Sequence, residues 1–225
     1  MVSVIIAASG TGERMGAGMP KQFLDLGGMP ILARTIAAFN SMEVVTCIAV
    51  AVPQGYVKEV TAYGFSKVQC VVEGGRDRTA SVYAALLSLP VTQGIVLVHD
   101  GVRPFVDEPL VCAVASAAAR HGAAVACTPV TDTIKSVDEN GRITATIDRN
   151  NLWRAQTPQG FTYSTLINAH NNAQAKGITA TDDCALVERM GIPAYIVPSS
   201  PRNIKITTVE DMTIAKAFLD WQGIT

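Results

Sequence analysis

The sequence predicts an α/β fold in which helices cover both faces of a mostly parallel sheet. Short β-rich runs alternate with amphipathic helical segments from residue 2 to residue 128, which is typical of βαβ units. Runs such as "VVTCIAVAV" at residues 44–52 are almost wholly apolar, as strands buried on both faces require. The 225 residues, 48% of them hydrophobic, suffice for one α/β core, so we expect a single domain over residues 1–225.

The elements expected before residue 130 follow from these runs in order. The apolar runs predict strands at about residues 2–8, 44–52, 67–73, 94–99 and 123–128. The segments between them predict helices at about residues 30–40, 55–63, 78–89 and 108–121. The last helix has clear boundary signals, because Asp107 suits an N-cap, Pro109 the first turn and Gly122 the position past the end. This order predicts a Rossmann-like sheet.

The alternation then gives way to a β-hairpin, in the segment "TIKSVDENGRITATIDRNNLW" at residues 133–153. Residues 138–141 are turn formers, and apolar and polar residues alternate over 143–148. An isolated two-stranded hairpin is marginally stable in water. We therefore expect an arm at about residues 131–152 that packs on a second subunit and forms a homodimer; the alternative is an arm folded back on its own chain.

The last third returns to mixed helix and strand. Helices are expected at about residues 164–176 and 182–190, strands at 194–198 and 203–206, and a final helix at about 208–221. Thr207 and Glu210 have the spacing of a capping box at the start of that helix. We interpret Asp182 and Asp183 as helix N-terminal acids that complement the helix dipole.

Composition and charge exclude several classes of protein. The formal net charge is −1, so no global basic field indicates nucleic acid or an anionic membrane surface as partner. The five cysteines are scattered and form no C-x-x-C, which indicates reduced thiols in a cytoplasmic protein. The three histidines have no zinc spacing. The start of the chain lacks a signal-peptide n-region, and no apolar run approaches about 18 residues, so neither secretion nor a membrane span is expected.

The loop after the first strand, "ASGTGERMGAGMPKQF" at residues 8–23, is the first candidate for ligand binding. Glycine-rich loops after a strand can bind phosphate through backbone N–H groups. The dinucleotide fingerprint fails at Met15, and a Walker A loop would need a Lys-Ser/Thr pair that is absent. A phosphate loop of another kind therefore remains, with Arg14 and Lys21 supplying charge; the alternative is a flexible turn with two surface cations.

Two further loops should meet this one. Ligands of open parallel sheets bind outside the carboxyl ends of the strands, which brings residues 10–21 together with "EGGRDR" at 73–78 and "HDGVRP" at 99–104. Half of the lysine and arginine residues fall in segments interpreted as loops or strand ends. These are Arg14, Lys21, Arg76, Arg78, Arg103, Lys135, Arg149, Arg202 and Lys205. If the fold brings them together, they form a cationic pocket for a small polyanion.

Seven motifs, taken together, resemble one enzyme family. They are "GTGERM", "MPKQF", "EGGRDRTASV", "VHDGVRPF", "TIDRNNLWRAQTPQGF", "TDDCALVE" and "NIKITTVEDM". In order and spacing, from about residue 3 to about residue 220, they resemble the 2-C-methyl-D-erythritol 4-phosphate cytidylyltransferases. The resemblance implies transfer of a cytidylyl group from CTP to 2-C-methyl-D-erythritol 4-phosphate, giving 4-diphosphocytidyl-2-C-methyl-D-erythritol and pyrophosphate, in non-mevalonate isoprenoid biosynthesis.

The chemistry of that reaction matches the residues at hand. A phosphate monoester has a second pKa of about 6 and is mostly a dianionic nucleophile at neutral pH, so no general base is required. The site must instead position two anions and stabilise charge on the α-phosphorus and the leaving pyrophosphate. Loop cations meet this need, and the sequence indicates no Ser-His-Asp or Cys-His arrangement.

By resemblance, the CTP site is built from three loops. Its expected members are Ala8, Ser9, Gly10, Thr11, Gly12, Arg14, Lys21, Gly74, Gly75, Arg78, Ser81, Asp100 and Gly101. The first loop would lay amides along the triphosphate, with Arg14 and Lys21 on its oxygens, and the residues from Gly74 to Ser81 would recognise cytosine and ribose. The alternatives are a lysine that caps a surface turn and a Gly-Gly turn with Ser81 buried on the following helix.

The acceptor site is likewise assigned by resemblance. Its expected members are Asp100, Arg103, Thr133, Arg149, Thr157 and Lys205, with Arg149 supplied by the neighbouring subunit. The expected catalytic residues are Arg14, Lys21, Asp100, Arg149 and Lys205. The alternatives are a structural pair of Asp100 with Arg103, and an Arg149 that pairs with Asp148 or is a surface cation. We interpret His99 as a satisfied strand residue.

The expected cofactor is Mg²⁺. Asp100 is a candidate ligand, and otherwise the CTP phosphates hold the ion, because Mg²⁺ needs few protein carboxylates and keeps several waters. The chain length predicts no fusion to the downstream cyclodiphosphate synthase.

Three other functions are alternatives to this one. Ribitol 5-phosphate cytidylyltransferase shares the CTP loops, but the arm sequence favours the methylerythritol enzyme. A noncatalytic nucleotide-binding module has the same fold, since fold does not fix function. A nicotinamide dehydrogenase is disfavoured by the failed fingerprint.

Overall fold

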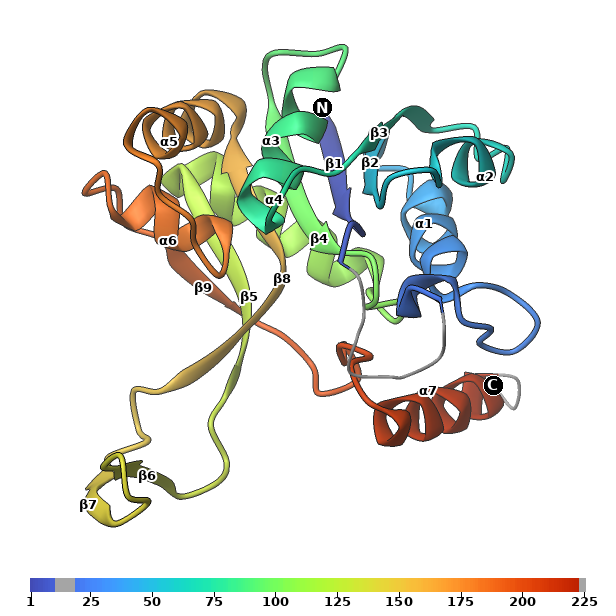
Figure 1. Cartoon of the computed structure of the whole chain (residues 1–225). Helices are drawn as coiled ribbons and strands as arrows, with labels where there is room; N and C mark the ends of the chain where they lie inside the picture. Colours follow the sequence, from blue (N-terminus) through green and yellow to red (C-terminus); the bar gives the residue numbers. More distant parts are fainter. Residues whose placement is uncertain (11–18, 223–225) are drawn as a thin grey trace.

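The computed structural model describes residues 1–10 and 19–222, which form a seven-stranded sheet with the strand order β3-β2-β1-β4-β8-β5-β9 (Figure 1). The strands of this sheet are β1 (Val2–Ala7), β2 (Val45–Val52), β3 (Val68–Glu73), β4 (Ile95–Asp100), β5 (Ala123–Pro129), β8 (Trp153–Thr162) and β9 (Tyr195–Pro198). Within this sheet, β8 runs antiparallel to its neighbours β4 and β5, and the other pairs are parallel. The prediction of a mostly parallel sheet is therefore confirmed.

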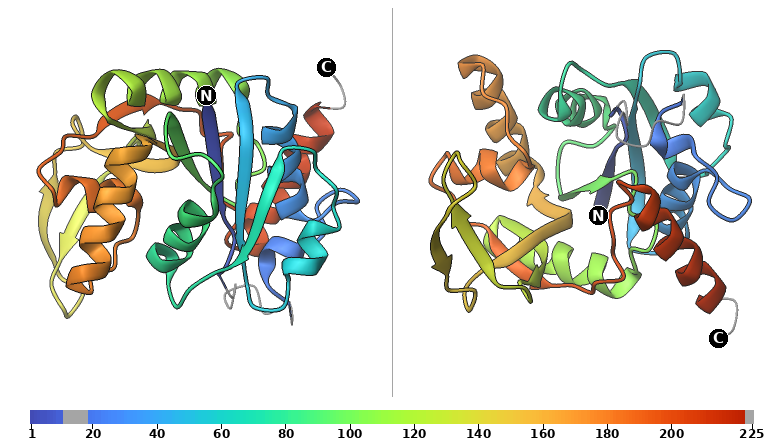
Figure 2. Two further views of the ribbon diagram at one scale, coloured as in Figure 1. Left: turned by 90° about the horizontal axis from the view of Figure 1, so that it is seen from above. Right: turned by 60° about the horizontal axis from the view of Figure 1, so that its bottom comes forward.

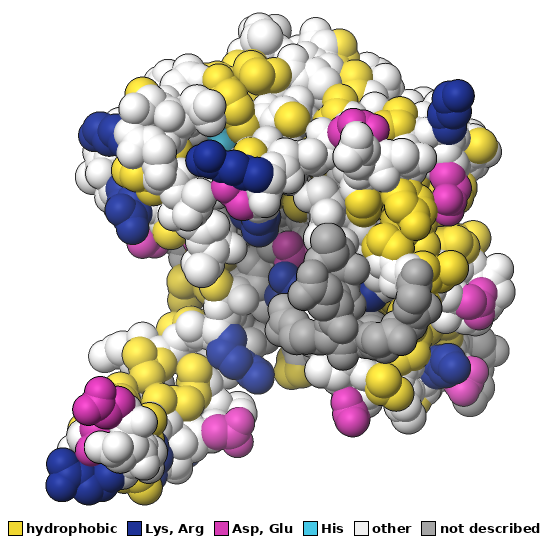
Figure 3. All heavy atoms as spheres, in the orientation of Figure 1, with side chains coloured by type: hydrophobic (Ala, Val, Ile, Leu, Met, Phe, Trp, Pro, Cys, Tyr) yellow, Lys and Arg dark blue, Asp and Glu magenta, His cyan; other side chains and the backbone are white. Residues whose placement is uncertain are grey.

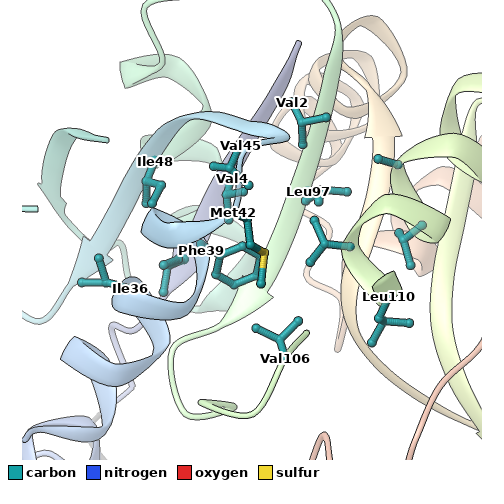
Figure 4. Close-up of a cluster of buried hydrophobic side chains, with 14 of the residues drawn as sticks. Val2, Val4, Ile36, Phe39, Met42, Val45, Ile48, Leu97, Val106 and Leu110 are labelled. Carbon is teal, nitrogen blue, oxygen red and sulfur yellow. The ribbon is translucent and has the colours of Figure 1, made fainter. Parts of the chain in front are cut away.

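Helices lie on both faces of the sheet, as predicted (Figure 2). They are α1 (Ile31–Ser41), α2 (Val57–Thr61), α3 (Arg78–Ser88), α4 (Glu108–His121), α5 (Tyr163–Lys176), α6 (Asp183–Glu188) and α7 (Val209–Gln222), with a short 3₁₀ helix, η2 (Lys21–Phe23). On one face, Phe39 of α1 and Leu110 of α4 pack against sheet residues such as Leu97 (Figure 4). On the other face, α3, α5 and α6 bury Leu86, Leu166 and Val187. None of the helices in the described residues has the length and apolar character needed to cross a membrane.

The predicted hairpin is present as a separate two-stranded sheet. Strands β6 (Ile134–Val137) and β7 (Ile143–Ile147) pair antiparallel, at the end of an extension that leaves the body from β5 and β8 (Figure 1). The Asp138 carboxylate accepts the Asn140 and Arg142 N–H groups in the turn. The whole of β7 is exposed, so the hairpin has no hydrophobic core of its own.

Two expectations about the last third were wrong, and one element was missed. Residues 203–206 form no strand, because Ile206 N–H donates only to the Val102 carbonyl while Asn203 bonds to β8 through its side chain. The capping box of α7 pairs Thr208 with Asp211 rather than Thr207 with Glu210. Strand β8 was not predicted, because its first half is exposed on the arm and its buried half carries the polar Thr157 and Gln159.

The carboxyl ends of β1, β3 and β4 meet at one edge of the sheet. In the strand register, Ala7 of β1 lies between Ala51 of β2 and Asp100 of β4. The backbone continues this pairing past the strand ends, where Gly101 N–H donates to the Ala7 carbonyl and Gly74 N–H to the Val52 carbonyl. The three loops singled out in the sequence therefore start side by side.

Candidate active site

A cavity of about 550 Å³ opens at this edge of the sheet. Its lining comes from the ends of β1 and β4, from η2, from the β3–α3 loop and from the segment between β9 and α7: Ala7, Ala8, Ser9, Gly10, Lys21, Gln22, Gly75, Arg76, Asp77, Arg78, Asp100, Val102 and Lys205. Figure 3 shows basic and acidic side chains together in the hollow at the centre of this face. The predicted convergence of residues 10–21, 73–78 and 99–104 is thus observed for the described parts of these segments.

The start of the first loop is fixed by a buried glutamine, Gln22, which was not predicted from the sequence. Gln22 follows Lys21 in η2, and its Nε2 donates to the carbonyls of Ala8, at 2.6 Å, and Gly10, at 3.0 Å. Both contacts turn carbonyl oxygens toward Gln22. In the structure, η2 buries both Gln22 and Phe23. The sequence "KQF" shows only a polar residue before an apolar one, which is a weak signal for a buried glutamine.

Two glycines are required by the close approach of the three loops. A Cβ atom on Gly74 would lie 2.2 Å from Cβ of Ser9, and one on Gly101 would lie 2.7 Å from Cβ of Ala8. Ser9 in turn donates to Ser81 Oγ at 2.7 Å, so the first loop is joined to α3. In the structure, the absence of a side chain on Gly74 leaves room for that of Ser9.

Asp100 is the electrostatic centre of the cavity. Its Oδ2 lies 3.0 Å from Lys205 Nζ and 3.3 Å from Arg103 Nε, and its Oδ1 lies 3.8 Å from Arg78 Nε. Burial would raise the pKa of this carboxyl, but attraction to Lys205, Arg78 and Arg103 outweighs burial and holds the pKa well below its usual range. Three cations around one carboxylate leave the cavity with a net positive charge, as predicted for a polyanion site.

Arg78 is held by a second carboxylate, that of Asp183. Arg78 Nη1 lies 2.6 Å from Asp183 Oδ2, and the other oxygen of Asp183 accepts from His170 Nε2 at 3.1 Å. Asp182 is the N-cap of α6 and accepts from Ala185 N–H, as its interpretation as a helix N-terminal acid implied. Asp183 is an acid of the first turn of α6, as the same interpretation implied, and it is also fully buried and ion-paired with Arg78.

A buried hydrogen-bond chain supports Asp100 from behind. His99 Nε2 donates to the Arg103 carbonyl at 3.0 Å, because a carbonyl can only accept. Its Nδ1 therefore accepts from Thr157 Oγ1, at 3.0 Å, and that same oxygen accepts the Asp100 N–H. His99 is a satisfied strand residue, as expected. Thr157 was expected in the acceptor site. Its hydroxyl instead takes part in these hydrogen bonds, and the residue is outside the cavity lining.

The burial of His99 gives a prediction for stability against pH. Burial lowers the pKa of His99 to about 4, whereas an unfolded histidine has a pKa of about 6.5. As the pH falls, His99 takes up a proton in the unfolded state before it does so in the folded state. The contribution of neutral His99 to the free energy of unfolding is therefore complete above pH about 6.5 and declines toward pH about 4. We expect the free energy of unfolding to fall by about 3 kcal/mol over this interval from His99 alone.

Denaturant unfolding at a series of pH values measures this decline. The control is His121→Gln, at an exposed histidine on the last residue of α4, which should keep the slope of the wild-type protein. His99→Gln should flatten it, and an unchanged slope in H99Q would contradict the assignment.

The arm residues lie apart from the cavity of their own chain. Thr133 and Arg149 are exposed, and neither is among the described residues that line the cavity. Arg149 Nη1 donates to the Thr131 carbonyl within the arm, and in the described chain it forms no ion pair with Asp148. Within one chain, therefore, the expected acceptor site is divided between the cavity and the arm.

The remaining predicted site residues fall into three groups. Thr11, Gly12 and Arg14 lie outside the described residues. Lys21 opens η2 and lines the cavity with Lys205, and Arg103 lies behind them against Asp100. Not every loop cation joins the pocket: Lys135 is on the arm with Arg149, and Arg202 lies 4.6 Å from the ring centre of Trp221 on α7. Within one chain, therefore, Lys135, Arg149 and Arg202 do not join the other loop cations in one pocket.

Comparison with known proteins gives a consistent result at the level of family and of fold. The family model described as "IspD: 2-C-methyl-D-erythritol 4-phosphate cytidylyltransferase" matches residues 2–221. Two curated proteins with that enzyme name, from Desulforamulus reducens and Geobacter metallireducens, are 44% and 45% identical to this chain; the alignments cover 97% of this chain in both cases, and 95% and 97% of the relatives.

Solved structures agree in fold over nearly the whole chain. The crystal structure of the cytidylyltransferase from Thermus thermophilus has a TM-score of 0.82 at 38% identity, covering 97% of this chain and 98% of that chain. The structure of a 4-diphosphocytidyl-2C-methyl-D-erythritol synthase from Anaerococcus prevotii has a TM-score of 0.85 at 27% identity, covering 98% of both chains.

Proposed function

Because the chain belongs to the 2-C-methyl-D-erythritol 4-phosphate cytidylyltransferase family, we propose that its cationic cavity is where CTP and the acceptor phosphate react. The chain is a nucleotidyltransferase that transfers a cytidylyl group from CTP to 2-C-methyl-D-erythritol 4-phosphate in isoprenoid biosynthesis. One observation carries the assignment of the site: Lys21, Arg78 and Lys205 converge on a single cavity beside Asp100.

The reaction requires positioning and charge stabilisation rather than a base. A phosphate oxygen of the acceptor attacks the α-phosphorus of CTP and forms a new P–O bond. The bond between the α-phosphorus and the oxygen that bridges it to the β-phosphorus breaks, which releases pyrophosphate. The acceptor is already a dianion at neutral pH, so no proton must be removed. Lys21, Arg78 and Lys205 attract both anions to one place and oppose their repulsion.

We assign the triphosphate to the first loop and Lys21, and the nucleoside to the β3–α3 loop. Gln22 fixes the Ala8 and Gly10 carbonyls, which supports a preformed start of this loop on the triphosphate side. Ser9 is hydrogen-bonded to Ser81, which supports a direct contact between the loop assigned to the triphosphate and the segment assigned to the nucleoside. Lys205 would face the acceptor, with Arg103 behind it on the same oxygen of Asp100, and His99 and Thr157 would hold Asp100 in place.

The family is generally dependent on a divalent metal, and we propose Mg²⁺. The described residues contain no group of three or more His, Cys, Asp or Glu side chains able to hold a metal, but Mg²⁺ is commonly bound by one or two carboxylates together with substrate phosphates. Asp100 is the carboxylate of the cavity lining that contacts its cations most closely, and it fits such a site together with CTP. The ion would neutralise phosphate charge as pyrophosphate leaves.

We further propose one domain over residues 1–225 with an arm at 131–152 that forms a homodimer. The arm carries Val137 and Ile143, which are 56% and 60% exposed, and such apolar surface on a protruding hairpin supports a partner. Arg149 of the neighbouring arm would then complete the acceptor site. The free state of all five cysteines supports a cytoplasmic location.

Pyrophosphate release from CTP and Mg²⁺ tests the acceptor. We expect release with 2-C-methyl-D-erythritol 4-phosphate, and release at no more than a few per cent of that rate with ribitol 5-phosphate or without acceptor. A preference for ribitol 5-phosphate would keep the CTP site and contradict the acceptor assignment. CTP binding without release, with either acceptor, would contradict the assignment of this cavity as a catalytic site.

A further inference from the structure

A buried chain of polar contacts runs from α5 to the wall of the cavity, through His170, Asp183 and Arg78. We propose that His170 is a positioning residue for cytidylyl transfer: it orients the Asp183 carboxylate, which in turn holds the Arg78 guanidinium at the cavity. His170 itself does not line this cavity, so its effect would pass through Asp183. This inference rests on the proposed role of the cavity in binding CTP.

The first link in the chain joins two helices. His170 lies on α5 and is almost wholly buried, and its Nε2 donates to Asp183 Oδ1 at 3.1 Å. Asp183 is the first residue of α6, and its N–H and that of Cys184 donate to Gln159 Oε1 on β8, at 2.9 and 3.1 Å. The backbone at Asp183 is therefore fixed to the sheet, while the orientation of its carboxylate depends on side-chain partners.

The second link places Arg78. Arg78 Nη1 donates to Asp183 Oδ2 at 2.6 Å, whereas its contact with Asp100 is longer, at 3.8 Å. The third nitrogen, Nη2, is buried and has no hydrogen-bond partner in the described part of the chain. Among the described residues, Asp183 is thus the only carboxylate that hydrogen-bonds this guanidinium, and a change in the Asp183 carboxylate is passed to Arg78.

Loss of the His170 donor has a defined consequence. A buried carboxylate oxygen without a donor is costly, so Asp183 would turn to share both oxygens with Arg78. Arg78 would then move away from its present position between Asp183 and Asp100. Because Arg78 lines the cavity on the side assigned to CTP, CTP binding should weaken while the acceptor side, around Lys205, stays as it is.

The neighbour Tyr83 provides a matched control. Its ring stacks on the His170 imidazole, with 5.8 Å between ring centres and 9° between the planes, and its hydroxyl donates to Asn171 Oδ1 at 2.8 Å. Tyr83→Phe removes a hydrogen bond between α3, which begins at Arg78, and α5, which carries His170, and leaves the contacts among His170, Asp183 and Arg78 intact. A general loosening of this region would affect both positions alike.

The test compares His170→Leu, His170→Gln and Tyr83→Phe by steady-state kinetics. H170L should raise the KM for CTP by about fivefold to tenfold, with the KM for the acceptor unchanged. The glutamine Nε2 is three bonds from Cβ, as is the histidine Nε2, so H170Q should restore the KM for CTP to within about twofold of wild type. Y83F should match wild type in both KM values. Should H170L fail to fold, His170→Asn, whose amide is too short to reach Asp183, takes its place.

Three outcomes would overturn the proposal: an unchanged KM for CTP in H170L, a loss in H170Q equal to that in H170L, or an equal rise in Y83F. Failure of the proposed function is separable, because it would show as no pyrophosphate release by the wild-type protein. In that case calorimetric binding of CTP to the same variants decides the role of His170: weaker binding in H170L with recovery in H170Q supports it, and equal binding in all of them refutes it.

Discussion

Replacement of Lys21 by alanine is expected to lower kcat for cytidylyl transfer by about 100-fold or more, while the Kd for CTP rises by less than about fivefold. Lys21 begins η2 and lines the cavity beside the first loop. Negative charge on the α-phosphoryl oxygens and on the leaving pyrophosphate increases as the reaction proceeds, so a cation held there stabilises the transition state more than the bound substrate. Rapid-quench turnover and calorimetric CTP binding measure the two quantities separately.

Arg76 provides the control for this prediction. It also lines the cavity, but its side chain is 76% exposed and pairs with the adjacent Asp77, so solvent screens its charge. Arg76→Ala should change kcat by no more than about threefold if the effect at Lys21 is local. Equal losses in kcat and in CTP affinity for K21A would show uniform binding instead, and equal effects at both positions would indicate only the general field of the cavity.

The sequence predicted those parts of the fold in which the pattern of apolar residues follows the burial of the strand. Strands β1, β2 and β4 are apolar on both faces because helices cover both sides of the sheet, and such runs are visible without any knowledge of pairing. Strand β8 is different. Its buried half includes Thr157 and Gln159, whose polar groups are satisfied by His99 and by the start of α6. Polar residues that are buried because distant parts of the chain hydrogen-bond them leave no trace in the local alternation of apolar and polar residues.

The same distinction explains what the sequence showed of the candidate site. The three loops were placed together because parallel strands end at one edge, which is a property of topology. The contact of Arg78 with Asp183 joins residues 105 positions apart, and neither sequence motif indicates that the other residue is its partner. Gln22 and His170 were missed for this reason: each acts on a backbone carbonyl or a carboxylate that only the folded chain brings near.

The proposed division of the acceptor site between the body of one subunit and the arm of the other leads to the second large prediction. Lys21 belongs to the body and Arg149 to the arm, so a dimer whose arms exchange builds each site from two chains. Homodimers of Lys21→Ala and of Arg149→Ala should each lose at least about 100-fold in kcat/KM for the acceptor. A mixed dimer has one site that carries both changes and one site that carries neither.

Co-expression of K21A with R149A should therefore restore activity. Random pairing of equal amounts makes half of the dimers mixed, with one intact site each, so about a quarter of wild-type activity is expected. The control is co-expression of K21A with Lys205→Ala, because both residues line the cavity of the body and every site then carries one change. Recovery in the first pair and none in the second requires that Arg149 acts on the partner's cavity. Failure of K21A with R149A to recover, with dimers present in solution, would place Arg149 in its own chain's site or outside any site.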